Sequence, residues 1–207
     1  YDVARVRADF PILARHVNGH PLVFLDSAAS SQRPRSVIEA VDHYETHCHA
    51  NVHRGVHALS QAATEAFEGA RERVRRFLNA RSAKEIIFTR GTTEAINLVA
   101  NSWARPRLGP GDEILISWLE HHANIVPWHF LRERQGVVLK WVDCDANGDL
   151  DPQAVIAAIG PRTKLVAFTH ASNIFGTIHP VAEITRFVHE RGAKVCVDGV
   201  AYAPHRL

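Results

Sequence analysis

The sequence has 207 residues, of which 46% are hydrophobic and 22% charged, and its formal net charge is +2 with the 14 histidines counted as neutral. That length is enough for one sizeable core, or for one domain with part of another. Interspersed acids and bases argue against a nucleic-acid-binding or polybasic surface. No apolar run approaches the ~20 residues of a membrane span, and the N-terminus lacks an apolar signal core. We therefore expect a soluble, cytoplasmic protein that binds neither nucleic acid nor membrane.

Two features of composition add to this. Cys48, Cys144 and Cys196 are widely spaced and form no C-x-x-C pair, which favours reduced thiols over a disulfide framework. Methionine is absent, including at position 1, so we expect that the chain does not begin at its natural start.

Helix and strand signals alternate along the chain in the order that builds a parallel sheet covered by helices, so the predicted fold class is α/β. One predicted helix begins at Pro34, and another begins at Pro152 with Asp151 as its N-cap. The other predicted helices span 60–80, 93–103, 124–135 and 181–191. The predicted strands span 85–89, 113–117, 137–142, 164–169 and 194–198. The series stops before a doubly wound sheet is complete.

The segment 89–97 directly follows the first predicted strand and opens a helix. Gly91 allows backbone N–H groups to approach a ligand closely, Thr92 and Thr93 add hydroxyl groups, and a helix N-terminus favours an anion. This pattern predicts a phosphate-binding site. A Thr cap that needs no ligand is the alternative.

A second candidate, Glu120-His121-His122-Ala123-Asn124, follows the strand 113–117. A histidine at the carboxyl end of a strand can stack on a planar cofactor and move protons near neutral pH. Adjacent side chains on an extended segment point opposite ways, so His121 and His122 are not expected to share one role. Zinc is the alternative, but H-E-x-x-H is missing and the nearby acids form no ligand set, so we predict no metal.

Three further candidates lie at other turns and strand ends. Asp198 ends an apolar strand, where open α/β sheets keep their ligands, and a buried carboxylate requires a cationic partner such as a protonated cofactor ring nitrogen. Capping of the next turn is the alternative. Asn173 has an amide for a ring substituent, or organises its own turn. In the loop 51–57, His53 and Arg54 are candidates for substrate contacts, or are simply solvated.

Together these signals place a phosphate site, a stacking histidine, an amide and an acid at successive strand ends along one edge of a sheet. Six segments carry a resemblance to a known family: 26–30 (DSAAS), 50–57 (ANVHRGVH), 90–94 (RGTTE), 120–128 (EHHANIVPW), 172–177 (SNIFGT) and 197–199 (VDG). In order and spacing they resemble the SufS-like cysteine desulfurases, which are fold-type I pyridoxal 5′-phosphate (PLP) enzymes of the class V aminotransferase group.

The resemblance implies a homodimeric enzyme that takes sulfur from L-cysteine, leaving L-alanine and an enzyme persulfide. A sulfur-acceptor protein of iron–sulfur cluster assembly would receive that sulfur. It also implies an N-terminal segment, 1–35, that lines the active site, and a PLP-binding large domain, 36–207, whose helix-flanked, mostly parallel sheet is incomplete in this chain.

The resemblance further assigns roles to individual residues. Gly91, Thr92 and Thr93 would hold the PLP phosphate, and His121 would stack on the ring as a catalytic proton carrier. Asn173 would contact the ring oxygen, and Asp198 would keep the pyridinium nitrogen protonated. The substrate side would be lined by Ala28, Ala29 and His53.

Two departures from the family pattern leave alternatives open. Where the family has D-G-A-Q, this chain has Asp198-Gly199-Val200-Ala201, so the glutamine amide is missing. The family's Schiff-base lysine, sulfur-accepting cysteine and carboxylate-binding arginine are expected beyond residue 207, so the chain alone is expected to be inactive. A PLP-dependent C–S lyase or other class V enzyme is one alternative, and a non-catalytic cofactor-binding or interaction fragment is another.

Overall fold

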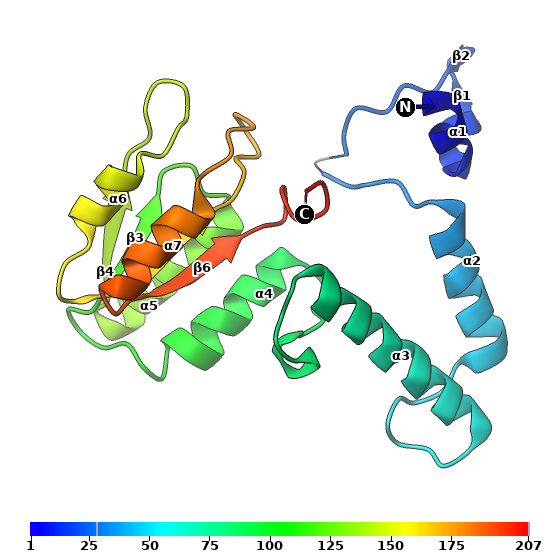
Figure 1. Ribbon diagram of the computed structural model, residues 1–207, viewed down its shortest axis with the longest axis horizontal. Helices are drawn as coiled ribbons and strands as arrows, with labels where there is room; N and C mark the ends of the chain where they lie inside the picture. Colours follow the sequence, from blue (N-terminus) through cyan, green and yellow to red (C-terminus); the bar gives the residue numbers. More distant parts are fainter. Residues whose placement is uncertain (28, 207) are drawn as a thin grey trace. The chain divides into compact units, whose positions relative to one another are not determined.

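A computed structural model of the chain describes all residues except Ala28 and Leu207 (Figure 1). The chain forms two compact units, Tyr1–Ile87 and Phe88–Leu207. Each unit is described by itself. None of the described helices is both long enough and apolar enough to cross a membrane.

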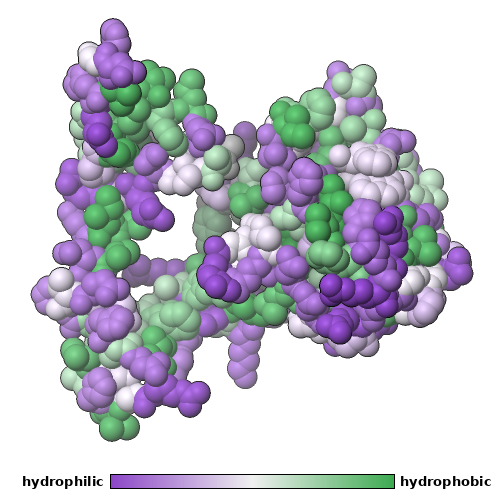
Figure 2. Space-filling view, turned by 180° about the vertical axis from the view of Figure 1, so that it is seen from behind, coloured by the Kyte–Doolittle hydropathy of each residue, from purple (hydrophilic) through white to green (hydrophobic). Residues whose placement is uncertain are grey.

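The first unit is mainly helical. Its elements are α1 (Val3–Ala8), the 3₁₀ helix η1 (Pro11–Ala14), β1 (His16–Val17), β2 (His20–Pro21), α2 (Arg35–His43), the π-helical turn η2 (Tyr44–Cys48), α3 (Ala58–Phe77) and the 3₁₀ helix η3 (Ala83–Glu85). The predicted helix at Pro34 is confirmed as α2, with Pro34 as its N-cap. Its apolar residues Val37 and Val41 remain 42% and 58% exposed. Figure 2 accordingly shows apolar patches among the polar surface of this unit.

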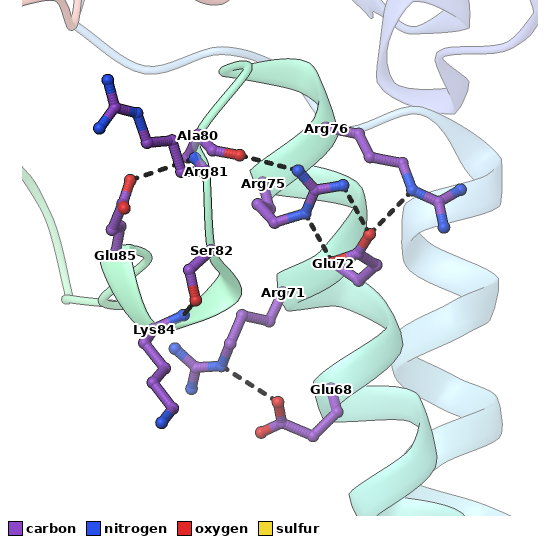
Figure 3. A network of polar contacts seen from close by, with 10 residues as sticks. All are labelled: Glu68, Arg71, Glu72, Arg75, Arg76, Ala80, Arg81, Ser82, Lys84 and Glu85. Atoms are coloured by element: carbon purple, nitrogen blue, oxygen red, sulfur yellow. Dashed lines mark hydrogen bonds and ion pairs between the residues drawn. The ribbon is translucent and has the colours of Figure 1, made fainter.

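The predicted helix 60–80 is confirmed as α3, and its last turns carry a polar network (Figure 3). Glu72 accepts hydrogen bonds from the Nε atoms of Arg75 and Arg76 at 2.8 and 2.9 Å. These two guanidinium groups lower the pKa of Glu72 to about 2. Arg75 also donates to the carbonyl oxygen of Ala80 at 2.7 Å, which ties the following turn to the helix end. These contacts hold the last turns of α3 and the turn that follows them together.

The predicted strand 85–89 is wrong. The segment begins in η3 and continues as irregular chain. Ile86 is buried, and its carbonyl oxygen accepts a hydrogen bond from Arg71. A strand requires the backbone ladder of a neighbour, and no described strand pairs with this segment. Its β-branched and aromatic residues favour a strand, but that propensity alone does not form one.

The second unit contains α4 (Thr92–Leu98), the π-helical turn η4 (Val99–Ala104), β3 (Glu113–Ser117), the 3₁₀ helix η5 (His122–Asn124), α5 (Val126–Gln135), β4 (Val138–Val142), α6 (Pro152–Ala158), β5 (Thr163–Thr169), α7 (Val181–Glu190) and β6 (Lys194–Asp198). These elements confirm the predicted helices and the four remaining predicted strands. Asp151 caps α6 by accepting from the N–H of Gln153, as expected. The strands form one parallel sheet in the order β4-β3-β5-β6, which confirms the α/β class.

Alternate strand residues point to opposite sides of this sheet. Helices pack on both sides, so both faces are buried. Ile114 and Ile116 of β3 pack with α4, η4 and α5 in one apolar cluster. Leu115, between them, packs with α6 and α7 in the other cluster. Figure 1 shows α7 crossing one face of the sheet while α5 lies behind it. Buried parallel strands of this kind read as continuous apolar runs, which is why the sequence pattern identified them.

The strand register decides where the candidate site residues lie. Ser117 of β3 pairs with Val142 of β4, and Thr169 of β5 pairs with Asp198 of β6. The carboxyl ends of all four strands therefore form one edge of the sheet, which is the edge where open α/β sheets bind ligands.

Candidate active site at the carboxyl edge of the sheet

Asp198 ends β6 and is 4% exposed. One of its carboxylate oxygens, Oδ1, accepts a hydrogen bond from the N–H of Val200 at 3.1 Å. The residue therefore does cap the turn that follows it. Within the described part of the chain, no Lys, Arg or His forms an ion pair with this carboxylate. A buried acid without a cation is costly, so the geometry leaves Asp198 available to a cationic ligand group.

Asn173 lies in the turn after β5, and its side chain does not organise that turn. Ser172 does so instead: its Oγ accepts from the N–H groups of Ile174 and Phe175, both at 3.2 Å. The N–H of Ser172 donates to the carbonyl oxygen of Thr177 at 3.0 Å, closing the loop. Asn173 is exposed, and its amide makes no hydrogen bond with a described residue. The amide is thus available for a ligand.

His121 lies between the end of β3 and η5, and its ring is exposed. Its Nδ1 accepts a hydrogen bond from the backbone N–H of Ala123 at 3.1 Å, so the neutral ring carries its proton on Nε2. The ring of His122 stands at 89° to that of His121, with the centroids 6.0 Å apart. The two rings therefore contact each other edge to face, and the expectation that the two histidines have different roles remains a prediction. Beside them, Trp118 stacks on Trp141 of β4 with centroids 4.1 Å apart.

Glu120, the residue before His121, was missed as a candidate on its own. It is 7% exposed, and its carboxylate accepts from Ser117 Oγ, from the N–H of Thr169 at 2.9 Å and from Asn124 Nδ2 at 2.6 Å. Burial raises the pKa of Glu120 from its ordinary 4.5 to about 7, these hydrogen bonds oppose the rise, and the charge of Asp198 adds to it. Two acids therefore lie close together at this edge.

Gly91, Thr92 and Thr93 open α4, with Gly91 at the N-cap. A Cβ placed on Gly91 would meet no atom within 4 Å, so the space beside this backbone is open. The first turn of a helix leaves N–H groups without intrahelical acceptors, and the hydroxyls of Thr92 and Thr93 donate to no described atom. Glu94 reaches back to the N–H of Arg90 at 2.7 Å. Figure 1 shows α4 beginning on the side to which the arrow of β6 points, and α4 packs against η5.

The predicted substrate-lining residues belong to the first unit. Ala28 lies outside the described residues, and Ala29 is exposed. His53 has a positive φ of 63°, and its Nε2 lies 3.0 Å from Glu68 Oε1 on α3. Their predicted role toward a substrate remains a prediction.

The lysines of the second unit lie away from the carboxyl edge. Lys164 and Lys194 are at the starts of their strands, on the opposite edge, and Lys140 Nζ lies 3.6 Å from Glu113 at the start of β3. Cys196 is directed into the core, and burial raises the pKa of its thiol to about 11. Over the described residues, no group of three or more His, Cys, Asp or Glu is placed to hold a metal ion.

A parallel α/β sheet with an acid, an amide and a histidine at its carboxyl edge is the arrangement of a cofactor-dependent enzyme domain. The family model for aminotransferase class-V matches residues 23–207. The chain belongs to this family. This agrees with the resemblance found in the sequence.

Named relatives narrow the comparison. The chain is 52% identical over 205 residues to a cysteine desulfurase of Enterobacter sp. (strain 638), a match that covers 99% of this chain and 50% of that protein. Among solved structures, the cysteine desulfurase CsdA of Escherichia coli superposes with a TM-score of 0.86 at 40% identity, over 99% of this chain and 50% of that one. The apo cysteine desulfurase of Thermococcus onnurineus NA1 superposes with a TM-score of 0.87 at 37% identity, over 94% of this chain and 46% of that one. The chain spans about half the length of the curated relatives it matches.

Proposed function

We propose that this chain supplies the cofactor-binding part of a PLP-dependent cysteine desulfurase. The observation that carries the proposal is the buried carboxylate of Asp198, which ends a strand of the parallel sheet without a cationic partner among the described residues. The protonated pyridinium nitrogen of PLP is a cation that enzymes of this kind pair with such a carboxylate. The likeness to proteins named cysteine desulfurase supports the choice within the family.

The donor set of this chain fits PLP at three further points. Gly91, Thr92 and Thr93 offer backbone N–H groups, hydroxyls and open space to a phosphate. Asn173 offers an exposed amide to the ring oxygen. His121 offers an exposed ring on the same edge for stacking. PLP requires each of these groups. Their hydrogen-bonding atoms have no other partner among the described residues, except that His121 Nδ1 accepts from the N–H of Ala123.

When bound, PLP supplies an electron sink that accepts the electron pair released at a substrate carbon. Asp198 would keep the ring nitrogen protonated, because a desolvated carboxylate strongly favours a cation beside it. His121 would hold a proton at Nε2, since its Nδ1 is occupied by the N–H of Ala123. Thr92 and Thr93 would fix the phosphate, so that the ring is oriented before any reaction begins.

In the proposed reaction of the whole protein, the C–S bond of L-cysteine breaks, and the sulfur forms a persulfide with a cysteine thiolate of the enzyme. The electron pair of the C–S bond stays on the carbon, where one proton takes the place of the sulfur, giving L-alanine. Cys196 is unsuited to accept the sulfur because its raised pKa keeps it a thiol. The remaining parts of the proposal follow from the resemblance: a cytoplasmic homodimer, a sulfur-acceptor protein of iron–sulfur cluster assembly, a segment 1–35 that lines the active site, and a PLP-binding large domain from residue 36. Ala28, Ala29 and His53 would line the substrate side.

A PLP-dependent C–S lyase is the second candidate, and Ala201 favours it. A methyl group stands where the resemblance leads one to expect an amide, so one hydrogen bond to the ring oxygen is lost. A lyase would release pyruvate and ammonia from cysteine, whereas a desulfurase releases alanine and leaves persulfide.

Product analysis of the full-length protein, loaded with PLP and given L-cysteine, tests both candidates. We expect alanine and protein-bound sulfur in equal amounts. Pyruvate with ammonia would replace the first proposal by the second, and neither set of products would refute both. An Ala201→Gln variant is the matched comparison, and we expect it to raise the yield of alanine.

A further inference from the structure

In the buried polar network around Glu120, the chemistry of each side chain decides which atom donates each hydrogen bond and which accepts it. The indole of Trp128 can only donate, and its Nε1–H points to Asn124 Oδ1 at 3.0 Å. The Asn124 amide must therefore turn its Nδ2 group toward Glu120, where it donates to Oε2 at 2.6 Å. Trp128 and Asn124 are fully buried, so water offers no substitute for these contacts.

The other carboxylate oxygen of Glu120 meets a donor that is equally fixed. The backbone N–H of Thr169, at the end of β5, donates to Oε1 at 2.9 Å. Ser117 at the end of β3 also donates to Oε1, while its own oxygen accepts from the N–H of Leu119 at 3.2 Å. One carboxylate thus joins the ends of β3 and β5 to η5.

This network also holds the backbone of His121 from both sides. Glu120 precedes it, and the N–H of Asn124 donates to the carbonyl oxygen of His121 at 2.8 Å. The Ala123 N–H, in the same short helix, donates to the His121 ring. The position of η5 therefore sets where the His121 ring points, and Glu120 is one of the groups that hold η5, through Asn124.

We propose that Glu120 is a positioning residue that aims His121 over the site by using both oxygens of its buried carboxyl group as acceptors. The catalytic consequence rests on the proposed function, whereas the hydrogen-bond geometry does not. Glu120 does not touch the reacting atoms in this scheme and acts only through η5.

The geometry makes a sharp distinction between Glu and Gln at position 120. Two obligatory donors, Thr169 N–H and Asn124 Nδ2–H, face two different oxygens. An amide has one oxygen, so glutamine must turn its NH₂ group against one of these donors. Asn124 cannot flip to relieve the clash, because its own NH₂ would then face the Trp128 N–H. Glu120→Gln is therefore disruptive although it preserves shape.

Removing the indole donor is expected to relieve that clash. In Glu120→Gln combined with Trp128→Phe, Asn124 is free to flip and accept from the amide newly placed at position 120, whose oxygen then serves Thr169 and Ser117. The double variant is expected to hold His121 better than Glu120→Gln alone. Opposed donors give this non-additive result, and a general loss of packing does not.

The test measures His121 directly in the full-length protein without cofactor. Ring ¹⁵N NMR, with the signal assigned through His121→Ala, reports which nitrogen carries the proton. Wild type is expected to show one tautomer, protonated at Nε2. Glu120→Gln is expected to show a mixture of tautomers and to lower kcat by up to about a hundredfold with PLP bound, since a displacement of about 1 Å at the site can cost that much in rate. The double variant is expected to recover the wild-type tautomer in part. Glu133→Gln, an exposed change on α5, is the matched control.

Three outcomes decide the proposal. Glu120→Gln with the tautomer and kcat of the Glu133→Gln control would overturn it, and so would a double variant in which His121 is disturbed as much as, or more than, in Glu120→Gln alone. If Glu120→Gln fails to fold, Asn124→Ala combined with Trp128→Phe decides: it removes the donor through which Glu120 holds η5, and an undisturbed His121 would then refute the network. Absence of desulfurase products in wild type would refute the proposed function, whereas the NMR result would still test the positioning of His121 by Glu120.

Discussion

Asp198→Asn separates the charge of the proposed cofactor partner from its shape. Asparagine has the same volume, and its Oδ1 still accepts the Val200 N–H that Asp198 accepts at 3.1 Å, so the turn after β6 is retained. What disappears is one buried negative charge at a position 4% exposed to solvent. Truncating one partner of a desolvated charge pair costs about 2–5 kcal/mol, which corresponds to about 30-fold to several thousand-fold in an equilibrium or rate.

The assay is a PLP titration of the apo full-length protein together with kcat/KM on L-cysteine. Asp151→Asn is the matched control, because Asp151 also accepts a backbone N–H two residues on, from Gln153 at 2.9 Å, but lies exposed at the start of α6. Asparagine caps a helix as well as aspartate does, so the control is expected to behave as wild type. A loss in Asp198→Asn of only a few-fold, in both affinity and kcat/KM, would refute the pairing of Asp198 with the cofactor.

Three further outcomes are expected. Thr92→Val and Thr93→Val should each weaken PLP binding by about 1–3 kcal/mol through an unmet contact, and inorganic phosphate should compete with PLP; unchanged affinity in the double variant would return both residues to simple helix caps. Because the pKa of Glu120 is raised to about 7, the folded protein keeps a proton that the unfolded chain releases above pH 4.5, so this group's contribution to the free energy of unfolding should fall by about 3 kcal/mol as pH rises from 4.5 through 7. Denaturation of wild type and Glu120→Gln at pH 5 and pH 8 checks this, since a difference that does not change with pH would contradict it. Borohydride treatment of the 207-residue chain with PLP should fix no cofactor at a specific lysine, and mass spectrometry showing stoichiometric labelling of Lys84, Lys140, Lys164 or Lys194 would disprove that.

The sheet of the second unit was predictable because its strands are buried on both faces. Such strands appear as apolar runs between turn residues, and all four were placed to within about one residue, β3 and β6 with the same bounds. The segment 85–89 has the same composition but lacks a described partner strand, and pairing is information that a local pattern does not contain. The β1–β2 hairpin was overlooked although Asn18-Gly19, with φ of 53° and 80°, is a strong signal for a two-residue turn.

Candidate site residues could be selected from the sequence where a single polar side chain follows an apolar strand. Asp198 and Asn173 were selected in that way, and their roles toward a cofactor remain predictions; the structure shows that Ser172, not Asn173, organises the turn. Glu120 was not found, because a buried acid is recognised by its partners and these come from 117, 124 and 169. The spacing of Glu120, Asn124 and Trp128 by four residues was visible. Only the fold shows that these side chains point inward rather than into water.

The stacked indoles of Trp118 and Trp141 make the state of this edge visible to light. Trp118 follows β3, two residues before Glu120, and Trp141 is on β4, so their 4.1 Å stacking requires that the two strands keep their register. Two stacked indoles at this separation, with their planes skewed by 20°, couple their electronic transitions and produce a paired circular-dichroism signal that isolated indoles lack. The protein thus contains an intrinsic optical reporter beside the proposed catalytic segment, which can follow loosening of that segment without an added label.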